Sequence, residues 1–170
     1  MKLRFGVLTV SDRSAAGVRE DLSGPALVRA IEDAGWLVSQ AHLVPDDFQK
    51  ITAVLTAWSD EELCSVILTT GGTGFSSRDI TPEATRSVID RDAPGLAEAM
   101  RAGSLKITPH AMLSRAVSGI RYKTLIINLP GSPKGALENF RIVAPVLVHA
   151  VQLLEDDDQA ESGHRTGRAI

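Results

Sequence analysis

The chain has 170 residues, of which 18 are Lys or Arg and 21 are Asp or Glu, giving a formal net charge of −3. This length predicts one domain with a full hydrophobic core, and without a block of basic residues we expect no nucleic-acid partner. No apolar run approaches the ~18–20 residues that span a bilayer, and the N-terminus lacks the features of a signal peptide. We therefore expect a cytoplasmic protein with no membrane partner. The single cysteine, Cys64, excludes an internal disulfide bond and a cysteine-cluster metal site.

Short apolar stretches typical of buried strands alternate with helical patterns in the first half of the chain. Strands are predicted over residues 4–10 and within 36–44. Between them, Ser23-Gly24-Pro25 begins a helix that Gly35 is expected to end. A second helix follows Asp47, its predicted N-cap. Its apolar stripe consists of Phe48, Ile51, Leu55 and Trp58.

The second half of the chain continues this alternation. Strands are predicted over residues 65–70 and 124–129. A helix is expected to begin with Thr81 as its N-cap and Pro82 in its first turn. Two short helical segments are expected around residues 96–101 and 110–116.

A long helix with one apolar face follows the last predicted strand. Pro145 is expected to kink or split this helix, because proline lacks the N–H that the helical ladder needs. From Glu155 onward the sequence is acidic and then rich in Gly and Arg, without apolar periodicity. We predict one domain over residues 1–154 and a mobile tail over 155–170.

The alternation of strands and helices predicts a three-layer α/β sandwich with a mostly parallel central sheet. In such sheets, ligands bind beyond the carboxyl ends of the strands. Four loops follow those ends in this sequence, and all four are built from Gly, Pro, hydroxyl and charged residues. They are residues 11–13, 45–47, 71–79 and 128–134.

The loop after the third strand contains three glycines within four residues, at Gly71, Gly72 and Gly74. Glycines let backbone amides approach an anion closely, although a tight turn between strand and helix would also use them. The loop lacks the lysine of a Walker A motif, and the Rossmann pattern fails at Ser77. The sequence therefore favours neither of the two common nucleotide-binding folds.

Two acids are candidates for metal-dependent chemistry. Asp79 could hold a divalent cation and Arg78 could neutralise phosphate, although an ion pair beside a helix start would explain both. Asp47 is explained as a helix cap, whereas Asp46 is not. If Asp46 faces Asp79 across the strand ends, the two carboxylates can place one Mg²⁺ against a triphosphate.

The remaining polar residues carry weaker signals. Two prolines make residues 128–134 a rigid loop, from which Lys134 could reach an anion, and a structured turn is the alternative. The four histidines have no metal-ligand spacing. We interpret Cys64, Met100 and Met112 as packing residues.

The run Thr69–Thr85, TTGGTGFSSRDITPEAT, resembles the signature of the MogA/MoaB family of molybdenum-cofactor proteins. That family includes bacterial molybdopterin adenylyltransferases and the matching domains of proteins such as gephyrin. Several separate matches in family order are more specific than one glycine loop, and they span roughly residues 3–154. Besides this run, the matches are residues 10–13, 21–25, 44–46, 94–95, 112–115 and 127–133.

The resemblance implies a three-layer α/β domain, usually a homotrimer, that binds molybdopterin and ATP. Adenylyltransferases of the family use Mg²⁺ to transfer AMP from ATP to the terminal phosphate of molybdopterin, and they release pyrophosphate. A partner molybdotransferase then uses the adenylylated product.

Carried over residue by residue, the resemblance makes Asp46 and Asp79 the essential acids and the Mg²⁺ ligands. It makes Gly71, Gly72, Thr73 and Gly74 the substrate and phosphate loop. The other substrate- and nucleotide-binding positions that it implies are Ser11, Asp12, Arg78, Thr81, Glu83, Ser114, Arg115, Asn128, Pro130, Gly131, Ser132 and Pro133. Lys134 follows the last match and is predicted to bind an anion from its place in the loop.

Two other functions stay open. The chain is short between Pro94-Gly95 and its last helix, as in MoaB-like members, which suggests a molybdopterin-binding protein without transferase activity. CinA-type domains share a related glycine loop followed by acids, which suggests a nucleotide pyrophosphatase. Such domains typically have paired aspartates where this chain has Arg78-Asp79.

Overall fold

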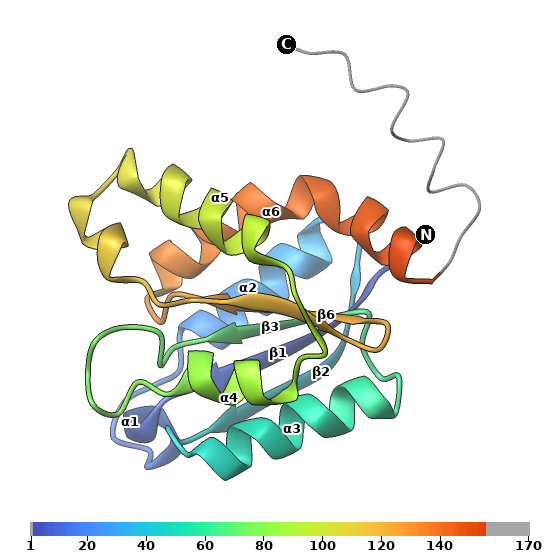
Figure 1. The fold of residues 1–170 in the computed structure, drawn as a ribbon. Helices are drawn as coiled ribbons and strands as arrows, with labels where there is room; N and C mark the ends of the chain where they lie inside the picture. The colour runs from blue at the N-terminus through green and yellow to red at the C-terminus, as the bar shows by residue number, and fades with distance from the viewer. Residues whose placement is uncertain (1, 156–170) are drawn as a thin grey trace.

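A six-stranded sheet with the order β2-β1-β3-β6-β5-β4 forms the middle layer of the computed structural model, which describes residues 2–155 (Figure 1). The neighbouring pairs among β1 (Arg4–Val10), β2 (Leu37–Val44), β3 (Val66–Thr70) and β6 (Thr124–Leu129) are parallel. Two short strands, β4 (Arg91–Asp92) and β5 (Ser118–Arg121), continue the sheet in antiparallel pairing. The predicted mostly parallel sheet is therefore confirmed.

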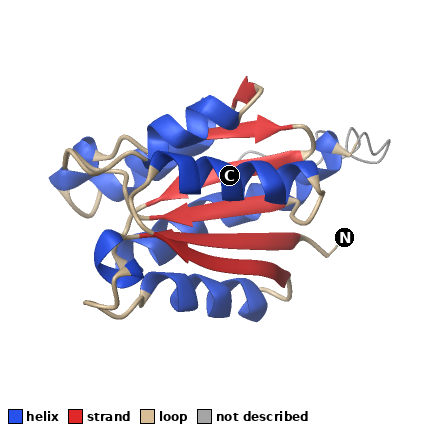
Figure 2. Cartoon of the chain, turned by 90° about the horizontal axis from the view of Figure 1, so that it is seen from below, coloured by secondary structure: helices blue, strands red, loops and turns tan. Residues whose placement is uncertain are grey.

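Helices cover both faces of this sheet, so the predicted three-layer sandwich is also confirmed (Figures 1 and 2). One layer contains α2, α5 and α6, and the other contains α3 and α4. The helices are α1 (Asp12–Ala15), α2 (Ser23–Asp33), α3 (Phe48–Asp60), α4 (Thr81–Val88), α5 (Pro94–Leu105), the 3-10 helix η1 (Pro109–Leu113) and α6 (Pro133–Leu154).

Alternating side chains of the strands fill two separate hydrophobic cores. In β1, Phe5 and Val7 pack toward α2 and α6, whereas Leu8 and Val10 pack toward α3 and α4. This is the period of two that a strand covered on both faces requires. Phe5 stacks on Trp36 with ring centroids 5.3 Å apart, which closes the first core at the start of the strand.

The region between α4 and β6 contains what the sequence patterns missed. Strands β4 and β5 were not predicted, because two and four residues are too short to show an alternating pattern. The helix expected around residues 96–101 extends over the whole of α5, and the next segment is the 3-10 helix η1. The four-residue helix α1 after β1 was also not predicted.

Helix α6 is continuous over 22 residues with Pro145 inside it, so of the predicted kink or split, the split is wrong. Pro145 is exposed, whereas Val143 and Leu147 on either side of it are anchored in the core. Among the described residues, α6 is the one helix long and apolar enough to cross a membrane, with a mean hydropathy of 1.3. Its buried face packs into the first core, which accounts for its apolar composition.

Three smaller predictions can be compared with the structure. Cys64 and Met100 are buried, as expected, but Met112 is 67% exposed and does not pack in the core. Phe48 of the predicted α3 stripe is also exposed. Glu155 ends α6, and the rest of the predicted tail, residues 156–170, lies outside the described residues.

Asn128 in β6 joins three elements of the fold. Its side chain is fully buried, and its amide nitrogen donates to the hydroxyls of Thr69 in β3, at 2.9 Å, and Thr85 in α4, at 2.8 Å. Its amide oxygen accepts from the N–H of Val117 before β5, at 3.3 Å. The family resemblance implied that Asn128 lines the pocket. Instead, both polar atoms of its side chain form hydrogen bonds inside the protein.

Replacing Asn128 by leucine tests this structural role. Asn128→Leu has similar volume but leaves two buried hydroxyls and one partly buried N–H without their partner, so we expect the free energy of unfolding to fall by about 2–3 kcal/mol. Urea unfolding followed by far-UV circular dichroism measures this change. A loss below about 0.5 kcal/mol would show that water or neighbouring groups satisfy the same atoms.

Candidate functional site

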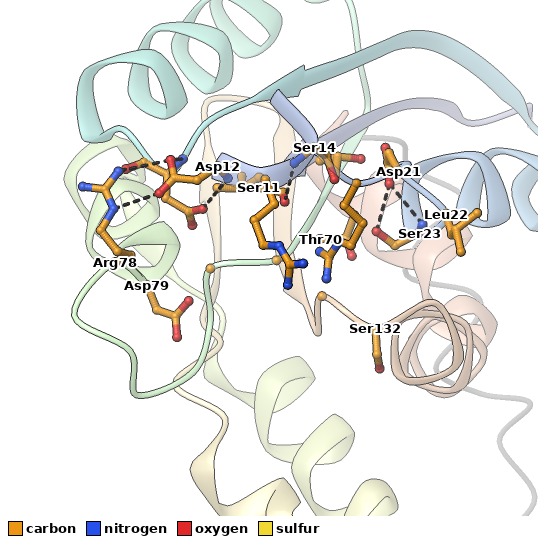
Figure 3. A pocket seen from close by; sticks show the side chains of 18 of the residues that line it. Ser11, Asp12, Ser14, Asp21, Leu22, Ser23, Thr70, Arg78, Asp79 and Ser132 are labelled. Carbon is orange, nitrogen blue, oxygen red and sulfur yellow. Dashed lines mark hydrogen bonds and ion pairs between the residues drawn. The ribbon is translucent and has the colours of Figure 1, made fainter. Parts of the chain in front are cut away.

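All four predicted loops meet at one cavity of about 650 Å³ at the carboxyl ends of the parallel strands (Figure 3). We call this the first cavity. Its presence confirms that the Gly, Pro and charged residues after β1, β2, β3 and β6 gather at one edge of the sheet. The predicted residues that line it are Ser11, Asp12, Asp46, Gly71, Gly72, Arg78, Asp79, Gly131, Ser132 and Pro133.

Asp46 and Asp12 bind each other reciprocally across the ends of β2 and β1. The Asp12 N–H donates to Asp46 Oδ2 at 2.8 Å, and the Asp46 N–H donates to Asp12 Oδ1 at 3.0 Å. The Arg78 guanidinium donates to both oxygens of Asp12, at 2.9 and 3.1 Å, and to the Asp46 carbonyl at 2.8 Å. Arg78 therefore docks the loop that carries Asp79 onto the strand end that carries Asp46.

Arg78 balances the negative charge of Asp12, but not those of Asp46 and Asp79, through its side chain. The hydrogen bond from Arg78 holds the pKa of Asp12 below its ordinary value. Burial raises the pKa of Asp46, and the nearby charges of Asp12 and Asp79 add to this effect. Figure 3 shows Arg78 turned toward Asp12 and the Asp79 carboxylate pointing away from that pair. Arg78 therefore pairs neither the Asp46 carboxylate nor the Asp79 carboxylate, and both line the first cavity with Glu20 and Asp21.

The glycine turn after β3 lies between the two acids. Gly71 and Gly72 have φ of 103° and 65°, the left-handed region that glycine adopts without strain. A Cβ on Gly72 would lie 2.9 Å from Asp46 Oδ1, and one on Gly74 would lie 2.9 Å from Asp79 Oδ2. Both acids thus contact the same turn, which is the arrangement that the sequence could not establish.

Three backbone amides of this turn are free to bind an anion. Among the described residues, the N–H groups of Gly72, Thr73 and Gly74 have no hydrogen-bond partner. Thr81 braces the turn from behind, because its hydroxyl donates to the Gly71 carbonyl at 2.9 Å. The N-cap of α4 is Ile80, so the predicted capping role of Thr81 is wrong and its hydroxyl serves the glycine turn instead.

A second cavity of about 450 Å³ adjoins the first on the other side of this turn. The two cavities share Gly72, Asp79, Gly131 and Ser132. Of the other predicted residues, Thr73, Gly74, Ser114 and Pro130 line the second cavity. Two cavities that meet at one acid and one glycine turn can hold two substrates with their reacting groups together.

Five predicted site residues lie outside both cavities, and they are Thr81, Glu83, Arg115, Asn128 and Lys134. Asn128 is buried beneath them, and Thr81 lies behind the glycine turn. Lys134 is 80% exposed, and its Nζ lies 3.9 Å from the carboxylate of Glu138, a residue that lines the second cavity. Glu83 forms an ion pair with Arg115.

Sequence reasoning missed several residues of both cavities. Arg19, Asp21 and Ser23 line the first, and Asp21 accepts from the N–H groups of Ser23 and Gly24 at the start of α2. The Asp-x-Ser-Gly pattern before α2 is the signal that could have placed this segment at the site. The second cavity also contains Arg101, Ser104, His110 and Asn139, from helices whose packing no local pattern reveals.

Comparison with known proteins identifies the family. The family described as "Probable molybdopterin binding domain" matches residues 6–149. This chain belongs to that family. The domain is 44% identical to a molybdopterin adenylyltransferase from Helicobacter pylori, over 89% of this chain and 88% of that protein. A crystal structure of the molybdopterin biosynthesis enzyme MoaB from Thermus thermophilus has a TM-score of 0.86 at 49% identity, covering 91% of this chain and 98% of that one.

Some relatives of this molybdopterin-binding domain are much longer. It is 41% identical to gephyrin from Dictyostelium discoideum, over 95% of this chain but 24% of that protein. Cinnamon from Drosophila melanogaster is 44% identical, over 91% of this chain and 26% of that protein. The domain thus spans about a quarter of the length of these two relatives.

The raised pKa of Asp46 predicts a pH-dependent cost to stability in this domain. Asp46→Asn removes the buried charge and keeps an oxygen that can accept from the Asp12 N–H, so we expect a higher free energy of unfolding at pH 7. At pH values below 3.8, the ordinary pKa of an aspartate, Asp46 is protonated in both the folded and the unfolded chain, so the variant should gain no stability there. The gain in the free energy of unfolding should grow as the pH rises from 3.8 through the raised pKa of the folded state.

Urea unfolding at a series of pH values measures this gain. The matched control is Asp47→Asn at the next position, because Asp47 caps α3 through the Lys50 N–H and asparagine caps a helix equally well. An identical pH dependence in Asp46→Asn and the unmodified chain would contradict the burial cost at Asp46.

Proposed function

We propose that this chain is a molybdopterin adenylyltransferase, which transfers AMP from ATP to the terminal phosphate of molybdopterin and releases pyrophosphate. The observation that carries the proposal is that Asp46 and Asp79 line one cavity, which meets a second cavity at Asp79. The similarity to bacterial proteins with this name, at 42–46% identity, supports the reaction. The family match to a molybdopterin-binding domain supports the acceptor.

We assign the triphosphate to the first cavity and the pterin to the second. Both acids, as well as Arg13 and Arg19, line the first cavity, which suits a metal-bound polyphosphate. The second cavity contains Ser104, Thr108, His110 and Asn139, which offer hydrogen bonds to a polar heterocycle. Asp79 and the glycine turn belong to both cavities, so the α-phosphorus and the attacking phosphate would meet beside them.

The residues of the first cavity fit a magnesium ion that arrives with the nucleotide. One oxygen of each acid is already used, since Asp46 Oδ2 accepts from the Asp12 N–H and Asp79 Oδ2 from the Ser76 N–H at 2.9 Å. Oδ1 of each acid receives no hydrogen bond from the described residues, so it can bind the cation. Among these residues, no group of three or more His, Cys, Asp or Glu could hold a metal. A Mg²⁺ ion here would share two carboxylates with water and phosphate oxygens, as it commonly does.

The reaction brings two anions together, so its barrier is mainly electrostatic. Mg²⁺ would supply a positive charge against the triphosphate. The free N–H groups of Gly72, Thr73 and Gly74 can donate to phosphate oxygens as charge moves toward the departing pyrophosphate. Arg13 and Arg19 add positive charge from the cavity wall. Because the acceptor phosphate is itself the nucleophile, positioning and charge stabilisation suffice without a covalent enzyme intermediate.

The assembly and cellular context of the enzyme belong to the same proposal. We infer a cytoplasmic homotrimer that hands its product to a molybdotransferase partner, as the resemblance of residues 69–85 to the family signature implies. The exposed apolar side chains of Ile107, Met112 and Leu113 provide surface that subunit contacts could cover. Sedimentation equilibrium distinguishes a trimer from a monomer.

Asp46→Asn and Asp79→Asn test the assignment of the acids. Each variant replaces a negatively charged carboxylate at the proposed metal site by a neutral amide. We therefore expect the rate of adenylylation to fall at least about 100-fold while molybdopterin still binds. Mass detection of adenylylated molybdopterin, after incubation with ATP and Mg²⁺, measures turnover. Asp47→Asn is again the matched control, and near-normal turnover of both test variants would refute these roles.

The same assay separates the two alternative functions. A binding protein without transferase activity would retain molybdopterin but release no pyrophosphate from ATP and Mg²⁺. A CinA-like pyrophosphatase would hydrolyse ADP-ribose or similar dinucleotides in the absence of pterin. Either result would replace the transferase assignment.

A further inference from the structure

Arg115, between η1 and β5, contacts the glycine turn and the acid loop along their length. Its N–H donates to the Thr73 carbonyl at 2.9 Å, and its Nε donates to the Gly74 carbonyl at 2.7 Å. Nη2 donates to the Asp79 carbonyl at 2.5 Å, and Nη1 binds the Glu83 carboxylate in α4. One residue thus joins four points spread over residues 73–83.

The segment that Arg115 holds has little structure of its own. Residues 71–80 contain neither helix nor strand. Their internal hydrogen bonds are confined to the tip, where the Asp79 N–H donates to the Ser76 carbonyl and the Ser76 N–H donates to Asp79 Oδ2. The position of this tip relative to the sheet therefore depends on contacts with other elements. Thr81 and Leu129 hold the start of the segment at Gly71 and Gly72, and the contacts of Arg78 and Arg115 reach the tip.

The guanidinium of Arg115 is poorly placed to bind substrate itself. Three of its N–H groups are directed to the Gly74 carbonyl, the Asp79 carbonyl and Glu83, and the Glu83 carboxylate balances its charge. Arg115 does not line either of the two cavities. This geometry differs from the substrate-binding role that the family resemblance implies for this position.

We propose that Arg115 is a positioning residue that fixes the carboxylate of Asp79 at the junction of the two cavities, a role that rests on the proposed adenylyltransferase function. Asp79 is held at its carbonyl by Arg115 and at Oδ2 by the Ser76 N–H, so its Oδ1 would be available to a cation. Three acceptors in different directions require the planar fork of arginine. A lysine keeps the charge but cannot reproduce that fork.

Arg115→Lys and Arg115→Ala distinguish a geometric role from a role of charge. If Arg115 positions Asp79, both variants should lose about 100-fold in kcat, with the KM for ATP changed less than about threefold. The Mg²⁺ concentration that gives half-maximal rate should rise in both. If Arg115 instead neutralises phosphate, Arg115→Lys should retain most of the rate and Arg115→Ala should mainly raise the KM for ATP.

Arg121→Lys is the matched control for removing an arginine fork. Arg121 binds both oxygens of Asp60, at 2.6 and 2.8 Å, and the Val88 carbonyl at 2.8 Å. It ends β5 beside the start of β6, at the opposite end of the sheet from both cavities. We expect this variant to lose stability in urea unfolding but to keep its kcat.

Amide hydrogen exchange of the substrate-free chain provides a readout that does not need turnover. The proposal predicts that Arg115→Lys speeds exchange at the amides of Ser76 and Asp79, and leaves the amides of β1 and β3 protected as in Arg121→Lys. Unchanged exchange in the 73–79 segment, or a normal kcat in Arg115→Lys, would overturn it. An unmodified chain that makes no adenylylated pterin would refute the proposed function, while the exchange result would still decide whether Arg115 holds the loop.

Discussion

The site depends on one interaction, in which Arg78 attaches the loop of residues 71–80 to the ends of β1 and β2. Its guanidinium binds Asp12 through two hydrogen bonds and reaches the Asp46 carbonyl, so the segment with Asp79 is attached to the segment with Asp46. This pairing satisfies Asp12, whereas no cationic side chain of residues 2–155 forms an ion pair with the Asp46 or Asp79 carboxylate. Burial raises the pKa of Asp46, and the nearby charges of Asp12 and Asp79 add to this effect. A divalent cation between the acids would relieve that unfavourable burial, and the site is therefore suited to a metal-bound polyphosphate.

Close backbone packing at the sheet edge explains why glycines gather there. Gly71 follows β3 and lies so close to the end of β1 that a Cβ would collide with the Val10 carbonyl. A Cβ on Gly131, after β6, would lie 3.1 Å from the Gly71 Cα. The ends of β1, β3 and β6 thus lie close together because no side chain separates their backbones. The amides of the glycine turn are left without partners beside the two cavities. The same residues that bring the strands together also make the anion-binding surface.

Local patterns predicted the parts of this protein whose causes are local. Apolar periodicity predicted the strand ends and the capping pattern predicted the Asp47 cap, and both predictions are confirmed. The partners of Arg78 and Arg115 were not predictable, because the ion pair of Arg78 joins residues 66 positions apart. Asn128 and Lys134 were assigned to the site by their loop, but one side chain turns into the core and the other toward solvent. Side-chain direction at a strand end is set by packing between elements, which a single sequence does not show.

The most direct test of the shared metal site is a crystal structure with Mn²⁺, in place of Mg²⁺, and an ATP analogue that carries a methylene group between its α- and β-phosphorus atoms. Anomalous scattering locates the manganese independently of the protein. The account predicts one Mn²⁺ in the first cavity, coordinated by Oδ1 of Asp46 and Oδ1 of Asp79 at about 2.2 Å and by phosphate oxygens. A manganese ion bound to the phosphates with neither carboxylate in its coordination shell would contradict the account.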